Sequence, residues 1–150
     1  MKGIRFEGIE LATPAPGVLD AVAHADVLLL CPSNPVVSIG TILDVPGIRE
    51  ALRDVAVVGV SPIVGGRVVR GMADRLLPAI GAEVSAAGVA ALYADFLDGW
   101  VIDEADAAHA DAIARTGVAV RVTDTIMRTP EVSAALARTA LDLAVATGRP

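Results

Sequence analysis

Four short apolar runs, of which only the last contains a charged residue, Arg121, constrain the fold of this chain more than any other feature of its sequence. They lie at Val27–Cys31, Val55–Val60, Trp100–Ile102 and Val118–Val122. Each consists mostly of β-branched residues or leucine, without the polar alternation of a half-exposed strand, which is typical of strands buried on both faces of a parallel sheet. We therefore predict four parallel strands.

The stretches between these runs have helical periodicity and recognisable ends. Ser85 opens a segment that places Val89, Leu92, Tyr93 and Phe96 on one face before Gly99 ends it. Strands that alternate with helices predict an α/β fold, with a Rossmann-like, doubly wound, mainly parallel sheet and helices on both faces. The other expected elements are helices at Val18–Ala25, Asp103–Gly117 and Thr129–Gly148 and a short strand near Ile4–Phe6.

Length and charge exclude several classes of protein. The 150 residues suffice for one domain, and a net charge of -6 with scattered arginines argues against nucleic-acid binding. The apolar runs are far shorter than the roughly 18 residues of a membrane-spanning helix. We expect a cytoplasmic protein, in which the lone Cys31 packs at a strand end.

Small polar residues follow the first apolar run, where a strand would turn into a helix. Ser33, Asn34 and Ser38 could bind an anion together with unpaired N–H groups at the helix start. An Asx turn with a helix N-cap explains the same residues without a ligand. Both interpretations remain open from this loop alone.

A second candidate loop follows the second apolar run. Gly65 and Gly66 would let the backbone approach a ligand closely, and Arg67 and Arg70 could pair with phosphate oxygens. The sequence fits neither common phosphate-loop pattern, GxGxxG or GxxxxGK[ST]. The alternative is a tight turn with solvated arginines.

Acidic residues follow the third and fourth runs. Asp103 stands directly before a helix and is predicted to be its N-cap, whereas Asp124 lies in a longer connection and could hold a ribose hydroxyl, a metal or a water. No His, Cys, Asp and Glu cluster has metal-site spacing, and neither His24 nor His109 follows a strand as a Ser-His-Asp site would require.

Taken together, four ordered motifs resemble the 2-phospho-L-lactate transferase family over nearly the whole chain. The motifs are Pro32–Ile39, Val60–Gly66, Val101–Asp106 and Thr123–Met127. The resemblance implies a transferase of coenzyme F-420 biosynthesis. Such an enzyme moves a phospholactyl or phosphoenolpyruvyl group from a guanosine diphosphate conjugate to the hydroxyl of the deazaflavin precursor Fo, with release of GMP.

The resemblance also implies which residues bind the nucleotide side of the donor. Two positions depart from the family, since Cys31 replaces a usual glycine and Met72 a usual proline, but neither change removes a polar group. The implied nucleotide and phosphate contacts are Ser33, Asn34, Pro35 and Ser38 in one loop, Ser61, Gly65, Gly66 and Arg67 in another, and, more weakly, Asp124.

Family members are longer chains, so residues 1–150 are expected to form the C-terminal part of a single Rossmann-like transferase domain. The catalytic residues and the ligands of the Mg²⁺ ion that the family uses are expected in the absent N-terminal half. This chain alone is therefore expected to be inactive. The resemblance further implies a homodimer of the full-length protein, and we favour enolpyruvate over lactate as the acyl group.

Two other interpretations remain. The fold superfamily contains proteins similar to the gluconeogenesis factor, which bind nucleotide sugars and regulate without known turnover. The chain could also be a degenerate fragment that only associates with a partner through its exposed strand edges. Stabilisation by GDP rather than by UDP-sugars would favour the transferase.

Overall fold

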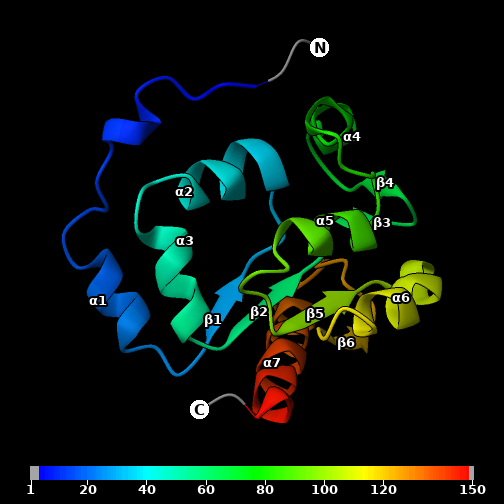
Figure 1. Cartoon of the computed structure of the whole chain (residues 1–150). Helices are drawn as coiled ribbons and strands as arrows, with labels where there is room; N and C mark the ends of the chain where they lie inside the picture. The colour runs from blue at the N-terminus through cyan, green and yellow to red at the C-terminus, as the bar shows by residue number, and fades with distance from the viewer. Residues whose placement is uncertain (1–3, 149–150) are drawn as a thin grey trace.

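The centre of the molecule is a four-stranded parallel sheet in the order β1-β2-β5-β6 (Figure 1). The computed structural model describes residues 4–148. The strands are β1 (Leu28–Leu30), β2 (Val57–Val60), β5 (Gly99–Ile102) and β6 (Ala119–Val122). Each coincides with one predicted run to within two residues at either end. The predicted α/β fold with a mainly parallel sheet is confirmed.

Helices cover both faces of this sheet. On one face, Val58, Val60 and Val101 pack against the long helix α7 (Pro130–Thr147). On the other face, Val57, Trp100 and Ile102 belong to a larger core that includes residues of α5 (Ala86–Leu92) and α6 (Ala110–Ala114). Alternate residues of one strand thus serve opposite cores, which explains why β2 and β5 contain no polar residue.

The Trp100 side chain of β5 packs directly against Gly59 of β2. A Cβ atom at this position would lie 2.4 Å from the Trp100 ring and 3.3 Å from the Leu30 Cβ. Only glycine fits there, because real Cβ atoms do not approach other heavy atoms so closely. Trp100 is 1% exposed, and its indole N–H donates a hydrogen bond to the Ala86 carbonyl of α5. This packing fixes α5 above the middle of the sheet.

The remaining elements connect the strands. Between β1 and β2 the chain forms a π-helix (Pro35–Gly40), α2 (Thr41–Leu43), α3 (Ile48–Ala51) and a 3₁₀ turn (Leu52–Asp54). After β2 it forms the antiparallel hairpin β3 (Ile63–Val64) and β4 (Arg67–Val68), then α4 (Ala73–Leu76) and a 3₁₀ turn (Pro78–Ile80). The others are 3₁₀ turns at Ile9–Leu11 and Glu104–His109 and the helix α1 (Val18–Ala23).

Several predicted helix ends are confirmed. The Ser85 side chain accepts a hydrogen bond from the Gly88 amide at the start of α5. Asp103 caps the 3₁₀ segment after β5, and Thr129 caps α7, which ends at Gly148 in the left-handed conformation. The residue types expected at these ends therefore mark the boundaries correctly.

Other sequence predictions are wrong. The segment Ile4–Phe6 is irregular rather than a strand, and no neighbouring strand is available to pair with it in residues 4–148. Helix α5 ends at Leu92 instead of continuing to Gly99, because turns at Tyr93 and Phe96 lead the chain back into the sheet. Cys31 follows β1 but is exposed rather than packed.

Of the helices between residues 4 and 148, none combines the length and the apolar character needed to cross a bilayer.

Candidate functional site

Loops from three strands meet at one pocket of about 410 Å³ at the carboxyl end of the sheet. They follow β1, β2 and β6, and the segment between β4 and α4 closes one side. Parallel sheets of this kind bind ligands at this end, and the volume falls in the usual range for small-molecule sites. The lining residues are Pro32, Ser33, Asn34, Ser61, Pro62, Val64, Val69, Arg70, Ala73, Thr125, Ile126 and Met127.

The loop after β1 is ordered by Asn34. Its side-chain oxygen accepts hydrogen bonds from the Val36 and Val37 amides at 2.9 and 3.1 Å, and its carbonyl accepts from the amides of Ser38 and Ile39. The helix start therefore does not leave these N–H groups free, which confirms the Asx turn with an N-cap as the interpretation of this loop. The Asn34 amide nitrogen has no hydrogen-bond partner in residues 4–148, so it remains available as a donor.

The helix that begins at Pro35 is a π-helix, a wider turn that occurs frequently at functional sites. Gly40 makes this turn possible, since a Cβ there would lie 2.9 Å from the Pro35 carbonyl oxygen. Pro35 itself is buried and lines a different cavity, on the other side of this segment. Ser38 is half-buried within the helix and does not line the pocket at the strand ends.

The loop after β2 is held by Ser61, which is 2% exposed. The Ser61 hydroxyl donates to the Ile63 carbonyl at 2.9 Å and accepts from the Ile63 amide at 3.2 Å. Gly65 and Gly66 form the two-residue turn between β3 and β4, with φ angles of 57° and 70°. Two consecutive positive φ angles define a type I′ hairpin turn, which by itself accounts for the Gly-Gly pair.

The two arginines of this region occupy different positions. Arg67 lies in β4 next to the turn and is exposed, while Arg70 lines the pocket. Neither makes an ion pair with any residue that the structure describes. Arg70 therefore offers the pocket an unpaired guanidinium group.

Asp103 connects the end of β5 to the loop after β6. Its carboxylate accepts hydrogen bonds of 3.0 Å each from the Ala105 amide, the Thr125 amide and the Thr125 hydroxyl. Burial tends to raise the pKa of Asp103, but these hydrogen bonds outweigh it and the pKa lies below its ordinary value. The ionised carboxylate thus holds Thr125 against the pocket wall.

Asp124 has a similar local role. One carboxylate oxygen accepts a hydrogen bond from the Ile126 amide at 3.0 Å, and the other pairs with Arg128. The Ile126 hydrogen bond, followed by the Arg128 contact, lowers the pKa of Asp124. The side chain is exposed and does not line the pocket, but it shapes the turn that carries Ile126 and Met127.

The structure thus brings some of the implied nucleotide contacts together and separates others. Ser33, Asn34 and Ser61 share the pocket, whereas Pro35, Ser38, Gly65, Gly66, Arg67 and Asp124 do not line it. Sequence reasoning missed Val69, Thr125 and Met127 as lining residues. Thr125 and Met127 carried a signal, because both stand in the strand-end motif Thr123–Met127, while Val69 carried none.

The described residues do not by themselves fit a divalent metal ion. Between residues 4 and 148, no group of three or more His, Cys, Asp or Glu side chains could hold one. The carboxylates near the pocket, Asp103 and Asp124, are already engaged by backbone amides and by Arg128. We therefore assign no step of a reaction to a metal bound by these residues.

The sequence is similar to known proteins along most of its length. The family model described as 2-phospho-L-lactate transferase CofD matches residues 2–139. A phosphoenolpyruvate transferase of Thermobifida fusca is 56% identical over 139 residues, which cover 92% of this chain and 42% of the relative. A protein of the same name from Kitasatospora aureofaciens is 54% identical, over 91% of this chain and 44% of the relative. Another from Mycolicibacterium smegmatis is 44% identical, over 93% of this chain and 43% of the relative. The chain thus spans less than half the length of these relatives.

Proposed function

Because this chain belongs to the 2-phospho-L-lactate transferase CofD family, we propose that it forms the nucleotide-binding side of a transferase in coenzyme F-420 biosynthesis. The donor is a guanosine diphosphate conjugate, the acceptor is the hydroxyl of Fo, and GMP is released. The relatives are named phosphoenolpyruvate transferases, which supports enolpyruvate over lactate as the acyl group of the donor.

One observation carries the proposal: the pocket at the strand ends collects polar groups that lack partners within the described chain. Ser33 contributes a hydroxyl, Asn34 an amide nitrogen and Arg70 a guanidinium group. All three can donate hydrogen bonds to phosphate oxygens, and Arg70 also brings positive charge. The chain has a net charge of -6 and so attracts anions only weakly as a whole. Binding of a phosphate in this pocket would therefore depend on the local positive charge of Arg70.

The pocket also has an apolar side on which a nucleoside could pack. Val64, Val69, Ile126 and Met127 line it, and Val69 and Met127 are 59% and 50% exposed. A bound base would shield these side chains from water. In this arrangement Arg70 and Ser33 hold the diphosphate, while the apolar side accepts the flat base.

Phosphoryl transfer needs positioning of the donor and neutralisation of charge on the transferring phosphorus. The residues of this chain position the donor and neutralise part of the charge on the transferring phosphorus. Mg²⁺, which the family uses, would supply the remaining charge stabilisation from ligands other than those described here. The proposal therefore predicts binding without turnover for the isolated chain.

Thermal unfolding tests the proposal. GDP at a saturating concentration should raise the midpoint temperature, since a ligand that binds only the native state stabilises it by mass action. UDP-glucose at the same concentration should have a smaller effect. Stabilisation by UDP-glucose but not by GDP would instead indicate a regulator similar to the gluconeogenesis factor and would refute the transferase.

A turnover assay tests the second half of the proposal. The isolated chain, supplied with the guanosine conjugate, Fo and Mg²⁺, should give neither GMP nor the phosphodiester product. Measurable turnover would show that residues 1–150 contain the complete catalytic machinery, and the assignment to the nucleotide side alone would then be wrong.

A further inference from the structure

Thr125 is the polar residue that the loop after β6 contributes to the strand-end pocket. It is 6% exposed, and its hydroxyl oxygen lies 3.0 Å from the Asp103 carboxylate, which also accepts a hydrogen bond from the Thr125 amide. The other hydrogen bonds that the structure describes for residues 124–128 join members of that loop to one another. Asp103 thus holds this loop to the end of β5 and fixes the position of Thr125.

The contact with Asp103 also fixes the direction of the Thr125 hydroxyl proton. Burial raises the pKa of Asp103, but the hydrogen bonds from Ala105 and Thr125 outweigh it and keep the pKa below its ordinary value, so the carboxylate is ionised at neutral pH. An ionised carboxylate only accepts hydrogen bonds, and the hydroxyl therefore donates its single proton to Asp103. Toward any further partner the Thr125 oxygen offers lone pairs and no proton.

This part of the pocket suits a neutral hydrogen-bond donor and not a phosphate. Phosphate oxygens are acceptors, and the negative charge of Asp103 lies 3.0 Å behind the Thr125 oxygen and repels anions. The loop after β1 and the segment between β4 and α4 have the opposite character, because Ser33, Asn34 and Arg70 can donate hydrogen bonds. The pocket therefore contains hydrogen-bond donors in one part and an acceptor in another.

The loops that carry these two parts follow the two outer strands of the sheet. In the order β1-β2-β5-β6, β1 leads to Ser33 and Asn34, and β6 leads to Thr125 (Figure 1). Ile126 and Met127 follow Thr125 and add apolar lining beside it. A ligand that fills the pocket thus meets phosphate-binding groups on the β1 side, and an apolar surface with one acceptor on the β6 side.

From these observations we propose that Thr125 determines specificity for the nucleoside part of the ligand, by accepting a hydrogen bond from an N–H group of the base or from a ribose hydroxyl. Asp103 is a positioning residue, which acts on the ligand through Thr125. The inference rests on the proposed function, because it takes the ligand to be a nucleoside diphosphate. It adds the orientation of the nucleoside and the chemistry that recognises it.

Calorimetric titration of two Thr125 variants with GDP tests the inference. Thr125→Val replaces the hydroxyl by a methyl group of similar size, so the Kd for GDP should rise roughly threefold to tenfold, as expected for loss of one hydrogen bond. Thr125→Ser keeps the hydroxyl and should restore the affinity of the unchanged chain.

Analogues of GDP identify the group that donates to Thr125. 1-Methyl-GDP lacks the N1 proton, IDP lacks the 2-amino group, and 2′,3′-dideoxy-GDP lacks both ribose hydroxyls. At least one of them should bind the unchanged chain about threefold to tenfold more weakly than GDP. That analogue and GDP should bind Thr125→Val with equal affinity, because the acceptor is then absent. A general disturbance of the loop would instead weaken all four ligands and preserve the difference.

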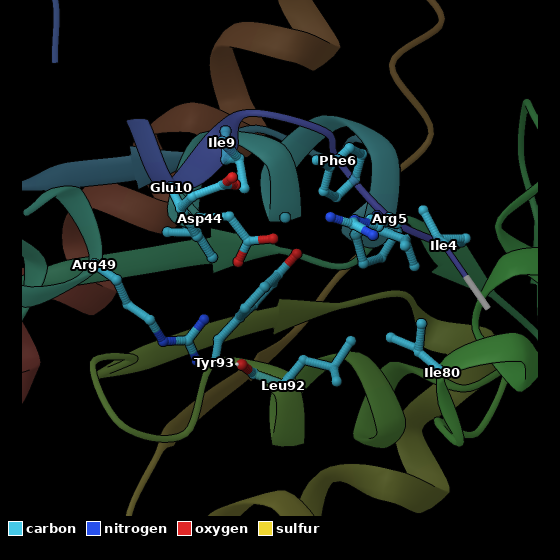
Figure 2. Close-up of a pocket in the computed structure, with 14 residues that line it drawn as sticks. Ile4, Arg5, Phe6, Ile9, Glu10, Asp44, Arg49, Ile80, Leu92 and Tyr93 are labelled. Atoms are coloured by element: carbon cyan, nitrogen blue, oxygen red, sulfur yellow. Dashed lines mark hydrogen bonds between the residues drawn. The ribbon is translucent and has the colours of Figure 1, made fainter. Parts of the chain in front are cut away.

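Two control variants remove a hydroxyl elsewhere. Thr123→Val makes the same change two positions earlier, at a residue outside the pocket lining. Tyr93→Phe removes the hydroxyl of a residue that lines a second pocket, of about 440 Å³, which shares no lining residue with the first (Figure 2). Both variants should bind GDP as the unchanged chain does.

Three results would overturn the inference while GDP binding keeps the proposed function intact. They are an unchanged GDP affinity in Thr125→Val, a preference for GDP over the weaker analogue that persists in Thr125→Val, and equal binding of GDP and all three analogues to the unchanged chain. The last result needs no variant and decides the matter if Thr125→Val does not fold. Absence of GDP binding to the unchanged chain would refute the proposed function, and the inference would fall with it.

Discussion

The carboxylate of Asp106 accepts a hydrogen bond of 2.8 Å from the backbone amide of Gly65, although the two residues lie 41 positions apart in the chain. Asp106 is 2% exposed and belongs to the 3₁₀ turn after β5, while Gly65 begins the turn of the β3–β4 hairpin after β2. This contact fixes the hairpin relative to the sheet. It therefore positions Val64, which lines the strand-end pocket.

Asp106→Ala should reduce the free energy of unfolding by about 1–3 kcal/mol, because the Gly65 amide loses its acceptor. Asp106→Asn should be milder, since the amide oxygen can accept the same hydrogen bond. Urea denaturation measures both. Asp111→Ala, at an exposed position of α6, is the control and should stay within about 0.5 kcal/mol of the unchanged chain. Equal effects at the two positions would show that the contact does not stabilise the fold.

Substitutions of Asn34 separate its role as a helix cap from its proposed role as a ligand. Asn34→Ala should lower stability by about 0.5–2 kcal/mol, because the Val36 and Val37 amides lose their acceptor. Asn34→Asp retains an acceptor oxygen and should leave the melting temperature nearly unchanged, while the added negative charge weakens GDP binding. Calorimetric titration with GDP checks this, and unchanged affinity in Asn34→Asp would remove Asn34 from the site.

Asp95 should make stability depend on pH in the acid range. The hydrogen bond from Arg49, with Arg53 as a second partner, lowers the pKa of Asp95 to about 2. A carboxylate with a lowered pKa stabilises the fold above its ordinary pKa near 4, and this stabilisation is lost as the pH falls toward 2. At pH 6 the unchanged chain should exceed Asp95→Asn by about 1 kcal/mol, a small value because the pair is partly exposed. The difference should shrink as the pH falls from 4 to 2 and vanish only below pH 2. A constant difference across this range would contradict the assignment.

Arg70 and Arg75 offer a matched pair for the proposed phosphate contact. Arg70 lines the pocket, whereas Arg75 is an exposed residue of α4 outside the lining. Arg70→Gln should weaken GDP binding about tenfold or more, as expected for a hydrogen bond to a charged group. Arg75→Gln changes the net charge by the same amount and should have little effect. If both weaken binding equally, the effect is one of overall charge rather than of a contact.

The sheet could be predicted from the sequence because its central strands, β2 and β5, are buried on both faces. In a chain with a net charge of -6, a short apolar run such as Val55–Val60 is most simply explained as a strand buried inside the fold. Caps were predictable for a related reason, since Ser85 and Thr129 satisfy amides of their own helices and need no distant partner.

The sequence did not reveal the β3–β4 hairpin, because a Gly-Gly pair suits a type I′ turn and a phosphate loop equally well. Nor did it distinguish Asp106 from its neighbour Glu104, although the first is buried and the second exposed. That difference arises from the Gly65 amide, which the fold brings near from another strand end. Ile4–Phe6 has the alternation of a strand but lies over helices, where no strand can pair with it.

Chemical-shift mapping with GDP on the ¹⁵N-labelled chain of 15.3 kDa shows directly whether the strand-end pocket binds the nucleotide. The largest amide shifts should occur around the ends of β1, β2 and β6, at Ser33, Asn34, Val64, Arg70 and Thr125. Absence of shifts at saturating GDP, or shifts confined to residues away from these strand ends, would contradict this binding site.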